Sequence, residues 1–161
     1  MDSEQRLWLA RDIQSRGAWP SVDDIDWAYF AGLLDADGCV SISRYRNSQG
    51  RVYYMLRVVL TNGDKPTVDR LGLELGGSVY IGNRNGPAHH VTVWKWAVSG
   101  RKAVDVLRQC LKHLRIKKLR ARVAIEYEKT MTGGMLSKAT IAQREKLYNR
   151  MKVLNQRWRH R

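Results

Sequence analysis

The first clear hydrophobic pattern along the chain is the run 25–34, which is apolar on nearly every side. Residues 35–38 stop the run, and three residues that favour helix starts precede it: Ser21, Asp23 and Asp24. The pattern predicts a helix. Because this helix has no polar face, we expect it to be buried on all sides.

A different period follows, in which apolar and polar residues alternate. Val40 and Ile42 alternate with polar neighbours, and the turn-forming residues 47–50 lead into a second β-rich run, 52–61. A further pair of β-rich runs, 78–84 and 90–98, is separated by strong turn residues at 85–87. The sequence therefore predicts two β-hairpins, the first with one polar face.

Helical patterns lie between and after the hairpins. Asp64 and Pro66 are suited to a helix start, and a glycine pair at 76–77 ends that helix. Ser99 opens a further helix, and another follows Lys117. The predicted order is helix, hairpin, helix, hairpin and C-terminal helices, which defines an α+β fold.

The two ends of the chain differ from its centre. Gly133 and Gly134 predict a hinge, after which Leu147, Met151, Leu154 and Trp158 keep helical spacing in a basic segment. We therefore divide the chain into an N-terminal extension (1–23), a core (24–130) and a basic C-terminal helical extension (131–161).

Net charge points to a class of partner. The 161 residues include 29 Lys and Arg against 15 Asp and Glu, a formal charge of +14. Such a surplus favours a polyanion, nucleic acid first, because lysine and arginine neutralise phosphates and release counterions. A basic protein without specific DNA binding, or one associated with ribosomes, has the same composition, so charge alone leaves these classes open.

Cysteine usage and hydropathy exclude several other classes. Cys39 and Cys110 lie far apart and have neither CxxC nor zinc-finger spacing, which argues against a disulfide framework or a zinc finger. Residues 1–20 contain no uninterrupted apolar segment like that of a signal peptide, and no stretch approaches membrane-spanning length. We expect an intracellular protein, in cytoplasm, nucleoid or an organelle matrix, that has no membrane partner.

One short motif carries chemistry. Residues 30–38 read FAGLLDADG, which resembles the motif that names the LAGLIDADG homing endonuclease family, with identity at seven of nine positions. The resemblance extends over about 24–129 through the order of elements. It implies a site-specific endonuclease that cuts both strands of double-stranded DNA by divalent-metal-dependent phosphodiester hydrolysis.

The motif occurs once, so the resemblance is to the single-motif type, in which a second copy of the chain supplies the other half. Small side chains on the motif helix allow close helix approach, and a C2 homodimer pairs one patch with itself. The target is then partly palindromic. The residues predicted at this interface are Ala28, Ala31, Gly32 and Asp35.

The resemblance also implies an active site. Asp37, the last acid of the motif, would hold Mg²⁺ or Mn²⁺, with Asp35 and Gly38 as structural support. Lys117 would stabilise negative charge on the reacting phosphate, and Asn62 would orient a water. The family often has glutamine in place of Asn62, and Lys65 is the nearest candidate for the family's further basic residue.

An antiparallel ribbon fits the DNA major groove, so the two hairpins would form a saddle on the target. If Val40 and Ile42 face the core, strand alternation turns polar side chains toward DNA. The alternation at 94–96 is too weak to choose a face. The predicted DNA-binding residues are Ser41, Ser43, Tyr45, Arg46, Asn47, Arg51, Tyr53, Arg57 and Arg84.

Two other functions remain open at this stage. The family also includes maturases that bind the intron RNA encoding them, and charge does not separate RNA from DNA binding. A regulator that keeps the fold without cleavage is the second alternative, against which the intact Asp37 argues.

Overall fold

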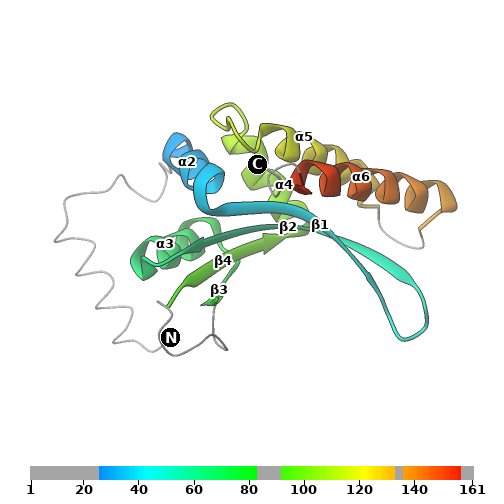
Figure 1. The fold of residues 1–161 in the computed structure, drawn as a ribbon, viewed down its shortest axis with the longest axis horizontal. Helices are drawn as coiled ribbons and strands as arrows, with labels where there is room; N and C mark the ends of the chain where they lie inside the picture. Colours follow the sequence, from blue (N-terminus) through cyan, green and yellow to red (C-terminus); the bar gives the residue numbers. More distant parts are fainter. Residues whose placement is uncertain (1–25, 83–91, 133–135, 157–161) are drawn as a thin grey trace.

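The computed structural model describes residues 26–82, 92–132 and 136–156 (Figure 1). Several predictions lie outside these residues: the extension 1–23, the helix start at Asp24, the turn at 85–87, the Gly133–Gly134 hinge, the helical position of Trp158 and the DNA contact of Arg84.

Helix α2 (Trp27–Asp37) contains most of the motif. The Asp26 carboxylate accepts hydrogen bonds from the backbone N–H groups of Ala28 and Tyr29, at 2.9 and 3.0 Å, and so caps the helix start. Phe30, Ala31 and Leu34 are buried, whereas Ala28, Tyr29 and Gly32 are exposed. The prediction of a helix buried on all sides is therefore wrong for the single chain, because nothing among its described residues covers this second apolar face.

The sheet has four antiparallel strands in the order β1-β2-β4-β3. Strands β1 (Gly38–Arg46) and β2 (Val52–Asn62) form the long predicted hairpin, which curves away from the helices in Figure 1. Strands β3 (Ser78–Ile81) and β4 (Trp94–Ser99) are shorter than the runs 78–84 and 90–98 suggest. Residues 83–91, which join them, lie outside the described part of the chain.

The remaining helices follow the predicted order and complete the α+β fold. They are α3 (Lys65–Leu75), α4 (Gly100–Cys110), α5 (Lys118–Tyr127), a short 3₁₀ helix η1 (Glu128–Thr130) and α6 (Lys138–Gln156). As predicted, Asp64 caps α3, accepting from the Thr67 backbone N–H at 3.0 Å. After α3 the chain turns at Gly76 with φ 61°, and the Gly76 carbonyl accepts from Trp96 Nε1 at 2.7 Å.

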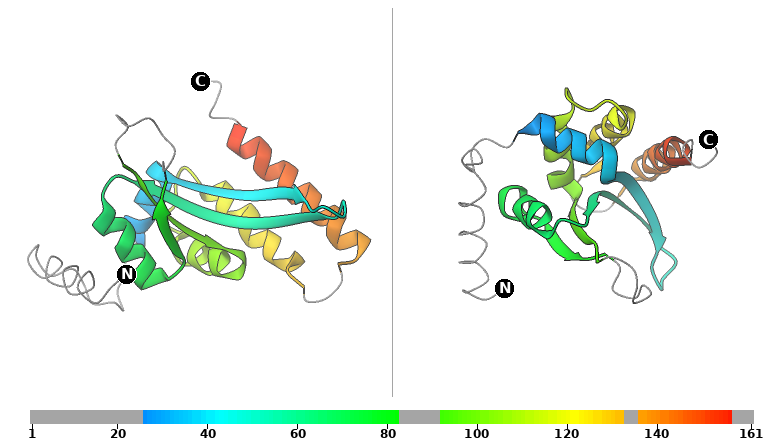
Figure 2. Two further views of the ribbon diagram at one scale, coloured as in Figure 1. Left: turned by 90° about the horizontal axis from the view of Figure 1, so that it is seen from below. Right: turned by 60° about the vertical axis from the view of Figure 1, so that its left-hand side comes forward.

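The helices gather on one side of the sheet. Helices α2, α4, α5 and α6 lie above it in Figure 1, and α6 runs beside α5 along the β1–β2 hairpin in Figure 2. Leu147 and Met151 of α6 are 2% and 1% exposed and belong to the same hydrophobic core as the sheet. The C-terminal helix thus packs onto the core. Within the described ranges, no helix is long and apolar enough to cross a membrane.

Candidate functional site

The candidate site begins where α2 turns into β1. Asp37 is the last residue of the helix and is exposed, while Gly38 starts the strand. A Cβ atom on Gly38 would lie 2.3 Å from Leu34 Cδ1 and 2.6 Å from the Leu34 carbonyl oxygen. Only glycine fits this tight turn from α2 into β1. Gly38 thus allows the strand to start directly after Asp37, whose carboxylate stays exposed.

Asn62 is the last residue of β2 and lies beside Asp37. Antiparallel pairing sets Gly38 opposite Leu60, so the end of β2 passes the end of α2. Asn62 Nδ2 donates to Asp37 Oδ2 at 3.0 Å, and Asn62 Oδ1 accepts from the Asp64 backbone N–H at 2.8 Å. Two residues predicted to act together are therefore in direct contact.

Asp35 binds the segment before α5, far along the chain. Its carboxylate accepts hydrogen bonds from three consecutive backbone N–H groups, those of Arg115, Ile116 and Lys117, at 2.7, 3.1 and 2.8 Å. The Asp35 carboxylate thus fixes the segment that leads into α5, and a negative charge near a helix start is stabilising. The supporting role predicted for Asp35 matches this geometry, whereas its carboxylate faces its own chain rather than the uncovered face of α2.

The side chain of Lys117 also contacts Asp35. Its Nζ donates to the Asp35 backbone carbonyl, near the end of α2. Burial lowers the pKa of Lys117, as does the positive charge of Arg120, while the charges of Asp35, Cys39 and Asp37 act in the opposite direction. Asp37 is therefore within electrostatic range of this ammonium group.

The uncovered face of α2 contains two of the four residues predicted at the interface. Ala28 and Gly32 are exposed, and a Cβ on Gly32 would meet nothing within 4 Å, so the helix surface is flat there. Ala31, by contrast, is 1% exposed and packs into its own chain. With 3.6 residues per turn, Ala31 points about 100° away from Gly32 and into its own chain, so little of its surface is left for a second copy, and its place at the interface stays a prediction.

The polar face of the β1–β2 hairpin is mostly where alternation puts it. Ser43, Tyr45 and Tyr53 are exposed, and the two tyrosine rings stack with centroids 5.5 Å apart. Ser41 and Arg57 are paired in register and are half-buried.

Some polar side chains at the hairpin tip form hydrogen bonds within the turn itself. Arg46 Nη1 donates to the Gly50 carbonyl at 3.3 Å, and Asn47 Oδ1 accepts from the backbone N–H groups of Gln49 and Arg51. Arg46 and Arg51 are nevertheless exposed, so both are available to a ligand at the tip.

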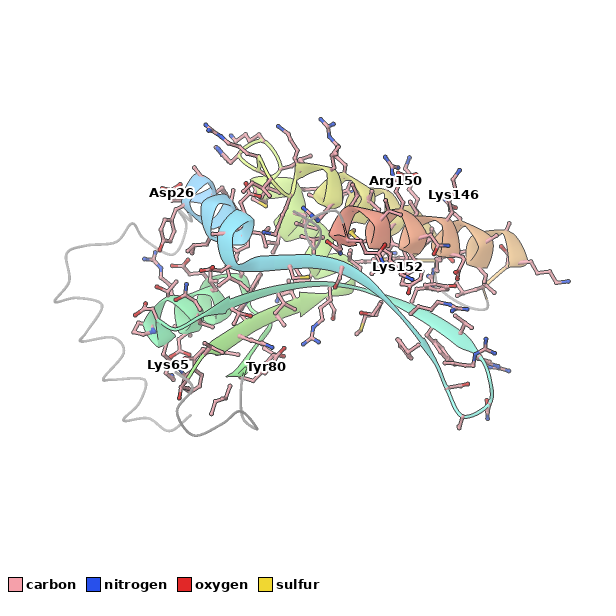
Figure 3. All side chains as sticks on the ribbon, in the orientation of Figure 1. Asp26, Lys65, Tyr80, Lys146, Arg150 and Lys152 are labelled. Atoms are coloured by element: carbon pink, nitrogen blue, oxygen red, sulfur yellow. The ribbon has the colours of Figure 1, made fainter. Side chains whose placement is uncertain are left out.

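Sequence reasoning placed the second hairpin on this face but identified neither Tyr80 nor the side on which Lys95 lies. Tyr80 accepts a 2.7 Å hydrogen bond from Arg57 Nη2, and Lys95 is paired with both Tyr80 and Thr61. Figure 3 shows Tyr80 at the opposite side of the molecule from Lys146 and Arg150, which project from α6. Trp96, its indole ring in the core, fixes Lys95 on the polar face. In the sequence, the tryptophans on both sides of Lys95 could have indicated that Lys95 lies on the polar face and its neighbours toward the core.

The chemistry of the site fits a divalent cation, because an exposed carboxylate supplies the hard oxygen that Mg²⁺ prefers. Across residues 26–82, 92–132 and 136–156, no group of three or more His, Cys, Asp or Glu side chains is placed to hold a metal ion. Within those ranges, the exposed carboxylate at the end of the motif helix is that of Asp37.

Comparison with known proteins gives the family. The model of the family described as LAGLIDADG endonuclease matches residues 30–132, which is more than half of the chain. The chain belongs to the LAGLIDADG endonuclease family. Among curated proteins, no match to the chain was found.

Solved structures with the LAGLIDADG fold resemble the chain at low sequence identity. The homing endonuclease I-CvuI, in complex with its target in the presence of Ca, has a TM-score of 0.67 and 18% identity, covering 80% of each chain. An archaeal intron-encoded homing endonuclease complexed with DNA has a TM-score of 0.68 and 17% identity, and the match covers 82% of this chain and 85% of that one. The homing endonuclease I-TnaI has a TM-score of 0.60 and 15% identity, and the match covers 83% of this chain and 98% of that one.

Other LAGLIDADG structures are matched over only half their length. In I-GzeII, in complex with a DNA target, 85% of this chain covers 50% of that chain, with a TM-score of 0.63 and 13% identity. These likenesses establish the fold, including the four-stranded antiparallel sheet and its covering helices. The match to half of I-GzeII also shows that one copy of this fold corresponds to part of a longer chain.

Proposed function

We propose that this protein is a site-specific homing endonuclease that cuts both strands of a partly palindromic double-stranded DNA by divalent-metal-dependent hydrolysis. The single observation that carries the proposal is the convergence of Asp37, Asn62 and Lys117 at the end of the motif helix. The DNA-bound relatives of the same fold support the choice of substrate.

Each residue has a task that its contacts explain. Asp37 is the ligand for a divalent cation, and Asn62 fixes the orientation of its carboxylate through the bond to Oδ2. Lys117 places a positive charge where the phosphate becomes more negative during displacement. A bound divalent cation would lower the pKa of the attacking water and stabilise the leaving oxygen.

The uncovered face of α2 supports the proposal of a homodimer. A flat strip at Ala28 and Gly32 sits next to the half-exposed Tyr29, and pairing it with a second copy removes apolar surface from water. The half-length match to I-GzeII supports two units of this fold as the working form. A C2 pair presents two Asp37 carboxylates, one for each strand, and two hairpins to symmetric half-sites.

The deciding experiment is selection of cleaved sequences from a randomised duplex library, with Mg²⁺ and with EDTA. We expect the wild type to recover a nearly palindromic site only with Mg²⁺, and Asp37→Asn to recover none. Recovery by Asp37→Asn equal to wild type would rule out the metal assignment. No cleavage by wild type, together with binding to structured intron RNA, would replace the nuclease with the maturase function.

A further inference from the structure

Arg120 is a buried charged side chain in the first turn of α5. It is 6% exposed, and its guanidinium makes three hydrogen bonds. Nε donates to Asn155 Oδ1 at 2.7 Å and Nη2 to the Leu154 carbonyl at 2.7 Å. Nη1 donates to the Ile116 carbonyl at 3.3 Å. A cation is stable at such burial only with partners of this kind, so Arg120 fixes the end of α6 against the start of α5.

Asn155 continues the connection to the strand that follows the motif. Its Nδ2 donates to the Val40 carbonyl in β1 at 3.2 Å. Val40 is fully buried and lies three residues after Asp37, while Ile116 directly precedes Lys117. Arg120 and Asn155 together therefore join the two backbone segments that carry the cation ligand and the cationic side chain.

We propose that Arg120 and Asn155 are positioning residues for DNA cleavage, which hold Lys117 in register with Asp37 through the last turn of α6. This inference rests on the nuclease function proposed above. Neither side chain touches the reacting atoms. Their effect passes through the backbone at Val40 and Ile116.

The contacts at the other end of α6 separate positioning from simple docking. Arg144 donates to the carbonyl and hydroxyl oxygens of Thr130, and Glu145 pairs with Arg44 at 3.3 Å. With Leu147 and Met151 in the core as well, α6 stays docked when the bonds of Asn155 are lost. The part of the network next to the site can thus be removed without removing the helix.

The test compares Asn155→Ala with the matched control Arg144→Ala, each as the full chain. For both, the single-turnover cleavage rate at saturating DNA, the Kd for DNA and the melting temperature are measured. We expect Asn155→Ala to cleave about 10- to 100-fold more slowly than wild type with an unchanged Kd. Arg144→Ala should lose thermal stability and keep the wild-type cleavage rate. Equal rate losses in the two variants, or no loss in Asn155→Ala, would overturn the inference.

A second variant guards against a folding defect. Asn155→Asp keeps an oxygen acceptor for Arg120, adds a negative charge that pairs with this guanidinium, and replaces the donor to the Val40 carbonyl by an oxygen. We expect it to fold and to cleave more slowly than wild type at unchanged Kd. Cleavage at the wild-type rate would overturn the link through Val40.

Hydrogen exchange separates failure of this inference from failure of the nuclease function. The backbone N–H groups of residues 115–117 bind Asp35, so their protection reports the register of Lys117 without DNA or metal. We expect faster exchange at these three positions in Asn155→Ala than in Arg144→Ala. If the wild type does not cleave DNA, the nuclease proposal fails, and equal exchange in the two variants would overturn the positioning role independently.

Discussion

Asn62 Nδ2 lies 3.0 Å from Asp37 Oδ2 and donates a hydrogen bond to it. The amide thus orients the carboxylate from the end of β2, while its own oxygen is fixed by the backbone N–H of Asp64. A ligand held this way needs little reorganisation when a cation and a phosphate arrive, and such preorganisation lowers reaction barriers.

Replacement of Asn62 by alanine should therefore slow cleavage and leave DNA affinity nearly unchanged. We expect the single-turnover rate to fall about 10- to 100-fold, the range usual for residues that orient a metal ligand. Asn149→Ala, on the exposed surface of α6, is the matched control. A wild-type rate for Asn62→Ala would show that the Asp37 carboxylate needs no such support.

Asp37→Asn should abolish cleavage but retain DNA binding. The amide is a poor cation ligand, and removing a negative charge near the phosphates takes away a repulsion, so affinity measured in EDTA should be equal or higher. Fluorescence anisotropy with a labelled target gives the Kd. A large loss of affinity in EDTA would mean that Asp37 serves the fold or the interface instead.

Lys117→Ala should slow the chemical step and leave DNA binding unchanged. The control Lys118→Ala, at the neighbouring residue, should change neither the cleavage rate nor the DNA affinity. Burial lowers the pKa of Lys117, so its ammonium loses the proton at a lower pH than an exposed lysine. Wild-type cleavage should accordingly decline on the alkaline side, and Lys117→Arg should remove that decline because guanidinium stays charged. If Lys117→Ala weakens binding and leaves the single-turnover rate intact, the lysine is a phosphate contact.

Two glycines of the motif should respond in opposite ways to alanine. Gly38→Ala inserts a Cβ 2.3 Å from Leu34 Cδ1 and should destabilise the fold by roughly 1–3 kcal/mol in chemical denaturation. Gly32→Ala meets nothing within 4 Å in one chain and should stabilise the isolated helix by about 1 kcal/mol.

Gly32→Ala also tests the homodimer, because the added methyl group lies on the face that a second copy would cover. We expect sedimentation equilibrium to show a weaker dimer for Gly32→Ala than for wild type. A monomeric wild type that still cuts both strands would contradict the symmetric arrangement.

The two cysteines should differ in reactivity. Cys110 is fully buried, and burial raises the pKa of its thiol to about 12, whereas Cys39 is exposed. The thiolate is the nucleophile, so a raised pKa lowers reactivity at neutral pH. Mass spectrometry after native alkylation should find modification at Cys39 only, with Cys110 reacting after denaturation. Rapid labelling of native Cys110 would mean that the packing of α4 against the core opens readily.

Local patterns in the sequence determined much of the fold. The alternation around Val40 and Ile42 predicts the hairpin, Asp64 predicts the start of α3, and the apolar run 25–34 predicts the motif helix, which in the structure continues to Asp37. These features depend on side chains within a few residues of one another, where backbone preference and hydrophobic period act directly. The residues that the motif implicated, Asn62 and Lys117, also came from sequence, through family resemblance.

Tertiary structure decided the features that depend on contacts between distant segments. Asp35 reaches N–H groups some 80 residues further along the chain, a pairing that no local pattern encodes. The placement of Ala31 inside and Gly32 outside depends on how α2 is rotated against the sheet, and an all-round apolar helix leaves that rotation open. The face of Lys95 was equally open until its pairing with Thr61 and Tyr80 set the register, because one-residue shifts exchange the two faces of a strand.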